Sequence, residues 1–325
     1  MNKIDNPFKG LRLPVIAAPM FLVSGPEMLL ACCNSGVVGT FPALNHRTTE
    51  GFNQWLTDIE TGLKSTAGTS AFAVNLIVHK TNPRLEDDLA VCVEHKVPLV
   101  ITSLGAVAEL VDKVHSYGGL VFHDVINLRH AQKAMDAGVD GLITVAAGAG
   151  GHAGTLSPFA LVNEIRKLFD GYVALSGCLS TGRDIAAAQM MGADFAYMGT
   201  RFINTRESLA VEGYKKMIAS ANAADIVYTD KVSGVYANFL GESLKQAGML
   251  SEQASTAKKA IDFGEELQPP ADGEAGAWKD IWSAGQGVGS IDTVPPSVTE
   301  LVDQLSAEYH EACAQHHKQS ADFAV

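Results

Sequence analysis

A glycine-dense loop with a single histidine near its end is the part of this sequence whose residue types and spacing most clearly predict chemistry. Residues 146–154 read AAGAGGHAG and follow an apolar segment that ends at Val145. Glycines let backbone amides approach a ligand closely, and an imidazole that titrates near neutrality can take or give a proton there. The pattern predicts His152 as a catalytic acid or base, with Gly150 and Gly151 as a backbone floor beside a bound ring. A surface histidine in a mobile loop is the plainer alternative.

Eight short apolar segments alternate with helix-like stretches up to about residue 200. This alternation indicates repeated βα units around a parallel sheet. Eight strands favour an α/β fold of the TIM (β/α)8 barrel type over a doubly wound open sheet, which normally has fewer strands. Helix starts are marked by Pro26, Pro158 and the Ser-Thr-Gly stretch at 180–182. The expected strands are 13–17, 37–40, 71–75, 99–102, 119–123, 141–145, 172–176 and 195–199.

The histidine loop also matches the dinucleotide-binding pattern G-x-G-x-x-G/A, with Asp170 near the expected acidic position. That match is weak, because in the pattern the loop opens directly into its helix. Here Ser157 and Pro158 mark a helix start several residues later. The barrel is therefore the preferred interpretation, and ligands of such barrels lie at the carboxyl ends of the strands.

Small and polar residues follow several of the expected strands, at the end of the barrel where ligands bind. Ser176, Gly177 and Cys178 follow the seventh strand, and Gly199 and Thr200 follow the eighth. Barrels often hold phosphate at these two places, although the glycines could also serve only tight turns. Further candidates are Ala18, Pro19 and Met20 after the first strand, Asn75 at the end of the third, and His123 and Asp124 at the end of the fifth.

The pattern changes after Phe202. Residues 206–268 look helical and show no clear strand, and residues 269–276 have the composition of a linker. We therefore expect a TIM barrel formed by residues 1–205 and 277–325, with a helical elaboration over residues 206–276 that covers the site.

Three features of this later region bear on the expected site. A second glycine-dense turn, residues 283–289, contains Gln286 and is expected to close over the site. Tyr236 and Asn238 could reach the site from the elaboration, although packing is the plainer role for both. A last helix is expected from about residue 296 to residue 310.

Composition and charge exclude several classes of protein. The 325 residues carry 24 basic and 36 acidic side chains, a formal net charge of -12, which argues against nucleic acid and anionic membranes as partners. No apolar stretch reaches the ~18 residues of a membrane span, and the first residues hold no apolar signal core, so a soluble cytoplasmic protein is expected. The 5 cysteines lack Cys-x-x-Cys spacing and the 10 histidines lack ligand spacing, so we expect reduced thiols and no metal.

The chain resembles the nitronate monooxygenase family, formerly called 2-nitropropane dioxygenases, over nearly its whole length. The motifs that carry the resemblance are AAPM (17–20), FAVN (72–75), AGGHAG (149–154), SG (176–177), MGTRF (198–202) and WSAGQG (282–287). The resemblance implies an FMN-dependent barrel in which FMN binds without a covalent link. Its ring would lie against Pro19, Met20, Asn75 and the glycine floor, and its phosphate on residues 176–178 and 199–200. Many relatives have a glycine at the position of Cys178, and the residues at the positions of His123 and Asp124 vary in the wider family.

The resemblance also implies an activity, the oxidation of alkyl nitronates, and of nitroalkanes, by O2 to carbonyl compounds and nitrite. A neutral His152 could remove the α-proton of a nitroalkane, and a protonated His152 could hold the nitronate by a charge-assisted hydrogen bond. Related barrels are NAD(P)H-dependent FMN reductases of quinones or enoyl thioesters, and this is the alternative function. A flavin-binding protein without turnover is a third. The sequence leaves open whether the protein forms a homo-oligomer.

Overall fold

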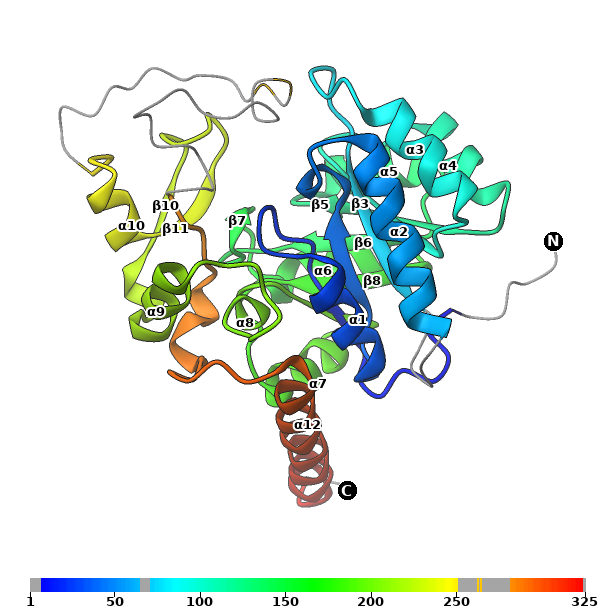
Figure 1. Ribbon diagram of the computed structural model, residues 1–325. Helices are drawn as coiled ribbons and strands as arrows, with labels where there is room; N and C mark the ends of the chain where they lie inside the picture. The colour runs from blue at the N-terminus through cyan, green and yellow to red at the C-terminus, as the bar shows by residue number, and fades with distance from the viewer. Residues whose placement is uncertain (1–6, 65–70, 251–261, 263, 265–280, 324–325) are drawn as a thin grey trace.

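A closed barrel of parallel strands forms the centre of the protein, as seen in a computed structural model that describes residues 7–64, 71–250, 262, 264 and 281–323 (Figure 1). The strand order is β1-β9-β8-β6-β5-β4-β3-β2, and a parallel bridge between Ile16 and Val38 joins its two ends. The strands are β1 Val15–Ala17, β2 Gly39–Pro42, β3 Phe72–Ile77, β4 Leu99–Ser103, β5 Leu120–Val125, β6 Gly141–Val145, β8 Tyr172–Ser176 and β9 Phe195–Met198.

Each of these strands overlaps one of the eight segments expected from the sequence, so the prediction of a TIM barrel is confirmed. One face of every strand points into the barrel and the other meets a helix, so both faces are buried. The four residues of β2 are all buried, for example, as are the three residues of β1. Burial on both faces explains why the strands appear in the sequence as continuous apolar segments rather than as alternating patterns.

The helices that follow the strands surround the barrel (Figure 1). Pro26 and Pro158 stand in the first turns of α1 and α6, as their position in the sequence predicts. Thr181 caps α7 by accepting a hydrogen bond from the backbone N–H of Asp184. The helices are α1 Pro26–Asn34, α2 Thr49–Lys64, α3 Leu85–Glu94, α4 Ala108–His115, α5 Leu128–Asp136, α6 Pro158–Arg166 and α7 Gly182–Met190.

Aromatic rings fill the amino-terminal end of the barrel. Phe8, from the segment before β1, packs with its ring centroid 4.7 Å from that of Phe195 and 5.3 Å from that of Tyr172. Phe122 of β5 joins the same cluster. Because these side chains block the barrel at that end, the carboxyl ends of the strands are left to hold a ligand.

The last helix, α12 Val298–Ala321, is longer than the sequence suggested. Ser297 caps its start by accepting a hydrogen bond from the backbone N–H of Glu300, and its first half packs on α1 and α7. No glycine or proline interrupts the chain after His310, so the helix continues beyond the expected end and projects away from the barrel (Figure 1). Within the described residues, no helix is both long enough and apolar enough to cross a membrane.

The segment after β9 contains strands as well as helices. Strands β10 Ile226–Thr229 and β11 Ala237–Leu240 are antiparallel, and β11 also pairs with β7 Gly151–His152, which belongs to the histidine loop. The expectation that residues 206–268 hold no strand is therefore wrong. The helices of this segment are α8 Thr200–Ile203, α9 Glu212–Ser220 and α10 Gly241–Gln246.

These short strands escaped prediction because their pairing depends on a partner far away in the sequence. Strand formation depends more on neighbouring strands than on local propensity. The β7 partner is only two residues long and lies in a glycine loop, which gives no strand pattern. The predicted linker, residues 269–276, lies outside the described residues, and the proposed domain boundaries remain predictions.

Candidate active site

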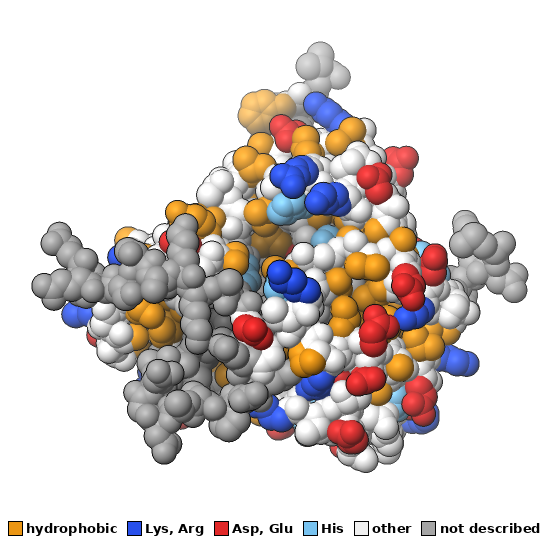
Figure 2. Space-filling view, turned by 90° about the horizontal axis from the view of Figure 1, so that it is seen from above, with side chains coloured by type: hydrophobic (Ala, Val, Ile, Leu, Met, Phe, Trp, Pro, Cys, Tyr) orange, Lys and Arg blue, Asp and Glu red, His pale blue; other side chains and the backbone are white. Residues whose placement is uncertain are grey.

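A cavity of about 670 Å³ opens at the carboxyl ends of the barrel strands. Its volume falls within the ~300–1,000 Å³ range of small-molecule sites. Figure 2 shows a hollow near the centre of the face seen from above. The predicted site residues that line the cavity are Ala18, Pro19, Met20, Asn75, His123, Gly150, Gly151, His152, Ser176, Gly177, Cys178, Gly199 and Thr200.

Gln286 is the predicted site residue that does not line this cavity, although its neighbours Gly285 and Gly287 do. Its backbone N–H donates a hydrogen bond to the carbonyl oxygen of Gly148 at 2.9 Å. The turn around Gln286 therefore packs on the histidine loop, with a backbone hydrogen bond between them, and its two glycines reach the cavity. A contact between the Gln286 side chain and a cofactor remains a prediction.

Two glycine turns pack backbone against backbone beside the cavity. A Cβ atom on Gly285 would lie 2.7 Å from the carbonyl oxygen of Gly148 and 3.0 Å from the backbone N of Gly150. A Cβ atom on Gly150 would lie 2.8 Å from the backbone N of Gly285. The hydroxyl of Thr200 accepts a hydrogen bond from that same N–H at 2.9 Å. The loops after β6 and β9 and the turn at Gly285 therefore form one close-packed wall.

The loops after β8 and β9 offer free backbone donors. Gly177 and Cys178 both have positive φ angles, 129° and 59°, which bends the loop sharply. Within the described residues, no acceptor takes the backbone N–H of Gly177, Cys178 or Gly199. Because backbone N–H groups with no partner in the protein favour an anion, these two loops suit a phosphate.

Cys178 adopts a left-handed backbone conformation that a side chain disfavours. We expect Cys178→Gly to leave the unfolding free energy within about 1 kcal/mol of the wild-type value, because relief of this strain offsets the greater flexibility of glycine in the unfolded chain. Thermal unfolding and the ratio of bound cofactor to protein are the measurements. A large loss of either would show that the Cys178 side chain itself holds the loop.

His152 is held between the barrel and the later segment. In the ladder, β7 places His152 opposite Ala237 and Gly151 opposite Asn238. The Asn238 side chain is only 3% exposed and donates a hydrogen bond to the carbonyl oxygen of Ala149 at 2.7 Å. Asn238 thus fixes the loop that carries His152. This is a structural role, the plainer of the two that the sequence allowed for Asn238.

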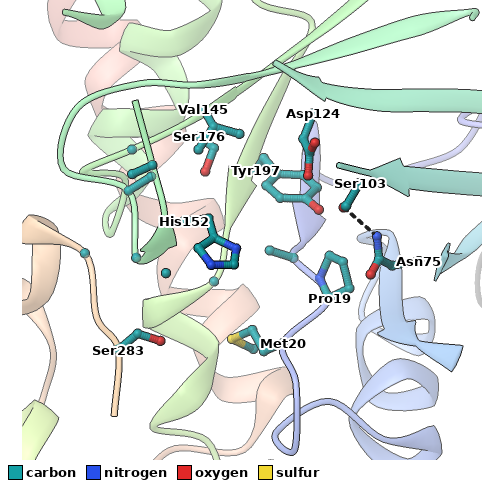
Figure 3. A pocket seen from close by; sticks show the side chains of 18 of the residues that line it. Pro19, Met20, Asn75, Ser103, Asp124, Val145, His152, Ser176, Tyr197 and Ser283 are labelled. Atoms are coloured by element: carbon teal, nitrogen blue, oxygen red, sulfur yellow. Dashed lines mark hydrogen bonds between the residues drawn. The ribbon is translucent and has the colours of Figure 1, made fainter. Parts of the chain in front are cut away.

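The imidazole of His152 projects into the cavity, with Met20 and Ser283 on the lower side in Figure 3. Its Nε2 lies 3.5 Å from the hydroxyl of Ser233. Burial lowers the pKa of His152 below its usual range, and the carboxylate of Asp124 acts in the opposite direction. A lowered pKa keeps the imidazole neutral near pH 7, so it can accept a proton.

The wall opposite His152 is polar and hydrogen-bonded. Asn75 donates a hydrogen bond to the hydroxyl of Ser103 at 2.8 Å (Figure 3). His123 is buried, and its Nδ1 lies 2.7 Å from the hydroxyl of Thr102. Burial lowers the pKa of His123, again against the effect of Asp124. Asp124 lines the cavity, so both histidines share it with a nearby carboxylate.

Several residues that line the cavity were not predicted. Tyr197 lies beside Asp124 in Figure 3, and burial raises its pKa well above the usual value. Alternation along β9 could have found it, because Phe195 and Tyr197 share the inward face of that strand. Ser103, Ser283 and Lys133 also line the cavity, but no pattern in the sequence marks them.

Arg201, next to the predicted phosphate loop, points elsewhere. Its side chain is 2% exposed and bonds to Asp292 at 2.9 Å and to Gln304 at 3.1 Å. Arg201 therefore links the end of the barrel to the returning chain and to α12, and its side chain is not available to the predicted anion site at Gly199.

A barrel with a glycine-walled cavity, free backbone donors for an anion and a half-buried imidazole has the features of a cofactor-dependent barrel enzyme. Comparison with known proteins identifies the family. The sequence model of nitronate monooxygenases matches residues 65–308. The chain belongs to the nitronate monooxygenase family, whose members are flavin-dependent oxidoreductases.

Similar proteins cover nearly the whole length of the chain. A nitronate monooxygenase from Paraburkholderia phytofirmans is 27% identical, with 95% of this chain and 95% of the relative covered. A nitroalkane oxidase from Streptomyces ansochromogenes has a TM-score of 0.76 at 24% identity, covering 94% of this chain and 98% of that one. FabK from Thermotoga maritima also has a TM-score of 0.76 at 24% identity, covering 96% and 97%. The two solved structures share the barrel fold.

Proposed function

We propose that this protein is an FMN-dependent nitronate monooxygenase that oxidises alkyl nitronates, and nitroalkanes that it first deprotonates, with O2 to carbonyl compounds and nitrite. Family membership supports the reaction class. The observation on which the proposal most depends is the position of the His152 imidazole, which projects into a cavity lined by glycine turns and whose pKa is lowered by burial.

The residues present fit FMN. The backbone N–H groups of Gly177, Cys178 and Gly199 would hold its phosphate. Gly150 packs against the Gly285 turn, where a Cβ atom would lie 2.8 Å from the backbone N of Gly285. Its backbone also lines the cavity, which suits close approach of a flat ring. When bound, FMN supplies the redox chemistry by taking electrons from the substrate and passing them to O2.

The protein's own residues would bind the substrate and move its proton. A nitroalkane is a carbon acid, so a neutral His152 can take its α-proton, and the resulting imidazolium can hold the nitronate. Met20, Ile126 and Val145 line the cavity and would supply apolar contacts for the alkyl part. Burial of the site would keep water away from the reacting atoms.

The charge of Asp124 should set the pH dependence of this step. In the wild type, turnover of a neutral nitroalkane should rise with pH as His152 loses its proton. We expect Asp124→Asn to move this rise to lower pH, because removing the carboxylate leaves the pKa-lowering effect of burial unopposed. The measurement is kcat/KM against pH.

Asp170→Asn is the matched control, since Asp170 is exposed and lies outside the cavity lining. It should leave the pH profile unchanged. A shift to higher pH in Asp124→Asn, or the same shift in both variants, would contradict the assigned effect of Asp124 on His152.

An anaerobic comparison separates this function from the alternative NAD(P)H-dependent reductase of quinones or enoyl thioesters. The purified flavin-loaded protein is mixed with NADH, then separately with a nitronate, and flavin absorbance is followed. Bleaching by the nitronate supports the proposal. Rapid bleaching by NADH alone would favour the reductase, because fold and cofactor site do not fix the substrate.

A further inference from the structure

Helix α5 brings positive charge to the edge of the cavity. His130 and Lys133 line the cavity, and Arg129 precedes them, exposed, in the first turn of the same helix. Figure 2 shows Lys and Arg side chains, with His beside them, gathered at one edge of the central hollow. Helices of a barrel usually lie outside its cavity, so this group is an addition to the strand-end site.

Among the residues that the structure describes, these cations have no acidic partner. Neither Arg129 nor Lys133 forms an ion pair there, and His130 accepts or donates no side-chain hydrogen bond within that part of the chain. The chain has 36 acidic and 24 basic residues, yet none of the described acidic side chains pairs with this group. The start of α5 adds a positive helix dipole at Arg129 and His130. An external anion would complete the charge balance.

The acidic residue that lines the cavity is at its inner wall. Asp124 lies at the end of β5, beside Tyr197 (Figure 3), whereas His130 and Lys133 belong to the helix that follows. The cavity is therefore negative at its inner wall and positive at the α5 edge. A ligand matches this arrangement if the end near Asp124 is neutral or carries hydrogen-bond donors and the end near α5 is anionic.

An aromatic surface stands on another side of the cavity. Tyr236, just before β11, lines the cavity and is 52% exposed. Its ring stacks on Tyr228 at a centroid distance of 5.0 Å, and the Tyr228 hydroxyl donates a hydrogen bond to the carbonyl oxygen of Ala153 at 2.9 Å. The Tyr236 ring is thus held in place and presents a face on which a planar base can stack.

We propose that the outer part of this cavity binds the phosphorylated adenine-nucleotide end of a larger ligand, with its phosphates on Arg129, His130 and Lys133 and its base on Tyr236. Two permanent cations and an imidazole within five residues suit a multiply charged phosphate better than a single carboxylate. The proposal goes beyond the proposed function, which requires only a small nitronate. Such an end occurs in coenzyme A thioesters and in NADPH, which share this chemistry.

The test is isothermal titration calorimetry on the flavin-loaded protein, with coenzyme A and NADPH as separate probes. We expect Arg129→Gln combined with Lys133→Gln to weaken binding by about tenfold. The double substitution would remove two exposed ion pairs with phosphate, each of which contributes modestly to the binding free energy. Lys167→Gln combined with Lys318→Gln removes the same charge from exposed positions outside the cavity lining, and should bind like the wild type. Raising the salt concentration should weaken wild-type binding more than binding by the α5 variant.

A second variant separates the base from the phosphates. Tyr236→Leu should weaken coenzyme A binding about tenfold and leave the affinity for inorganic pyrophosphate unchanged. Tighter binding of one probe identifies the source of the nucleotide and supports the proposal in either case. Failure of both probes to bind, or equal binding by the α5 and control variants, would overturn it. Neither result depends on nitronate turnover, so the proposed function is tested separately.

Discussion

His152→Asn is expected to keep the protein folded and flavin-loaded while lowering turnover of neutral nitroalkanes by about 10²–10⁴-fold. Asparagine can replace a hydrogen bond of the imidazole but cannot accept a proton at neutral pH. The β7–β11 pairing that fixes this position uses backbone groups, and Asn238 bonds to Ala149, so neither depends on the imidazole. The measurements are flavin content, O2 uptake and nitrite release.

The choice of substrate makes this prediction specific to proton removal. A nitronate prepared in advance has already lost its α-proton, so the variant should lose much less activity on it. His317→Asn, on the exposed part of α12, is the matched control and should change neither activity. Equal losses on nitroalkane and nitronate would remove the general-base role and leave His152 only a binding role.

The sequence was sufficient to predict the barrel because its strands are buried on both faces. Segments such as β4 and β6 stand out as short apolar stretches between amphipathic helices. Strands β10 and β11 were missed because they are stable only against each other and against β7 of the histidine loop. The extent of α12 was also underestimated, since its last turns are exposed and carry no apolar pattern.

The position of the candidate site could be predicted for a simpler reason. Parallel strands of a barrel all end on the same side, so residues that follow different strands meet there. The order of strands and loops along the chain is therefore enough to bring His152, Asn75 and Gly177 around one cavity. The roles of these residues remain predictions.

Other cavity residues could not be found in this way, because side-chain direction decides them. Lys133 belongs to a helix outside the barrel, and Ser283 follows a long excursion of the chain. Neither position is implied by strand order. Sequence order likewise does not show that Arg201, which follows Thr200, turns its side chain toward Asp292 and not into the cavity.

Gly285→Ala is expected to cause a large loss of bound flavin, although it adds only one methyl group. The backbone of Gly285 has φ −88°, which alanine adopts without strain, so the effect would be purely steric. The new Cβ would lie 2.7 Å from the carbonyl oxygen of Gly148 and would push apart the two turns that form one wall of the cavity. Overpacking of this kind costs about 1–3 kcal/mol.

Flavin content after purification and thermal unfolding with and without added FMN measure this effect. Separating the turns would also break the hydrogen bonds from Gln286 to Gly148 and from Gly285 to Thr200, so the loops after β6 and β9 would lose their common support. A drop of about tenfold in FMN affinity corresponds to ~1.4 kcal/mol, which lies within the expected cost.

Gly289→Ala is the control, because it lies in the same turn and its Cβ would make an ordinary contact 3.5 Å from the Cα of Asn222. If both variants retain flavin equally, close packing of the Gly285 turn against Gly148 and Gly150 does not shape the cofactor site. If Gly285→Ala alone loses flavin while its unfolding temperature recovers on addition of excess FMN, the wall formed by the two turns is part of the binding site. In that case the methyl group favours an arrangement in which the two turns are separated, and excess FMN restores the packed arrangement because it binds only to that one.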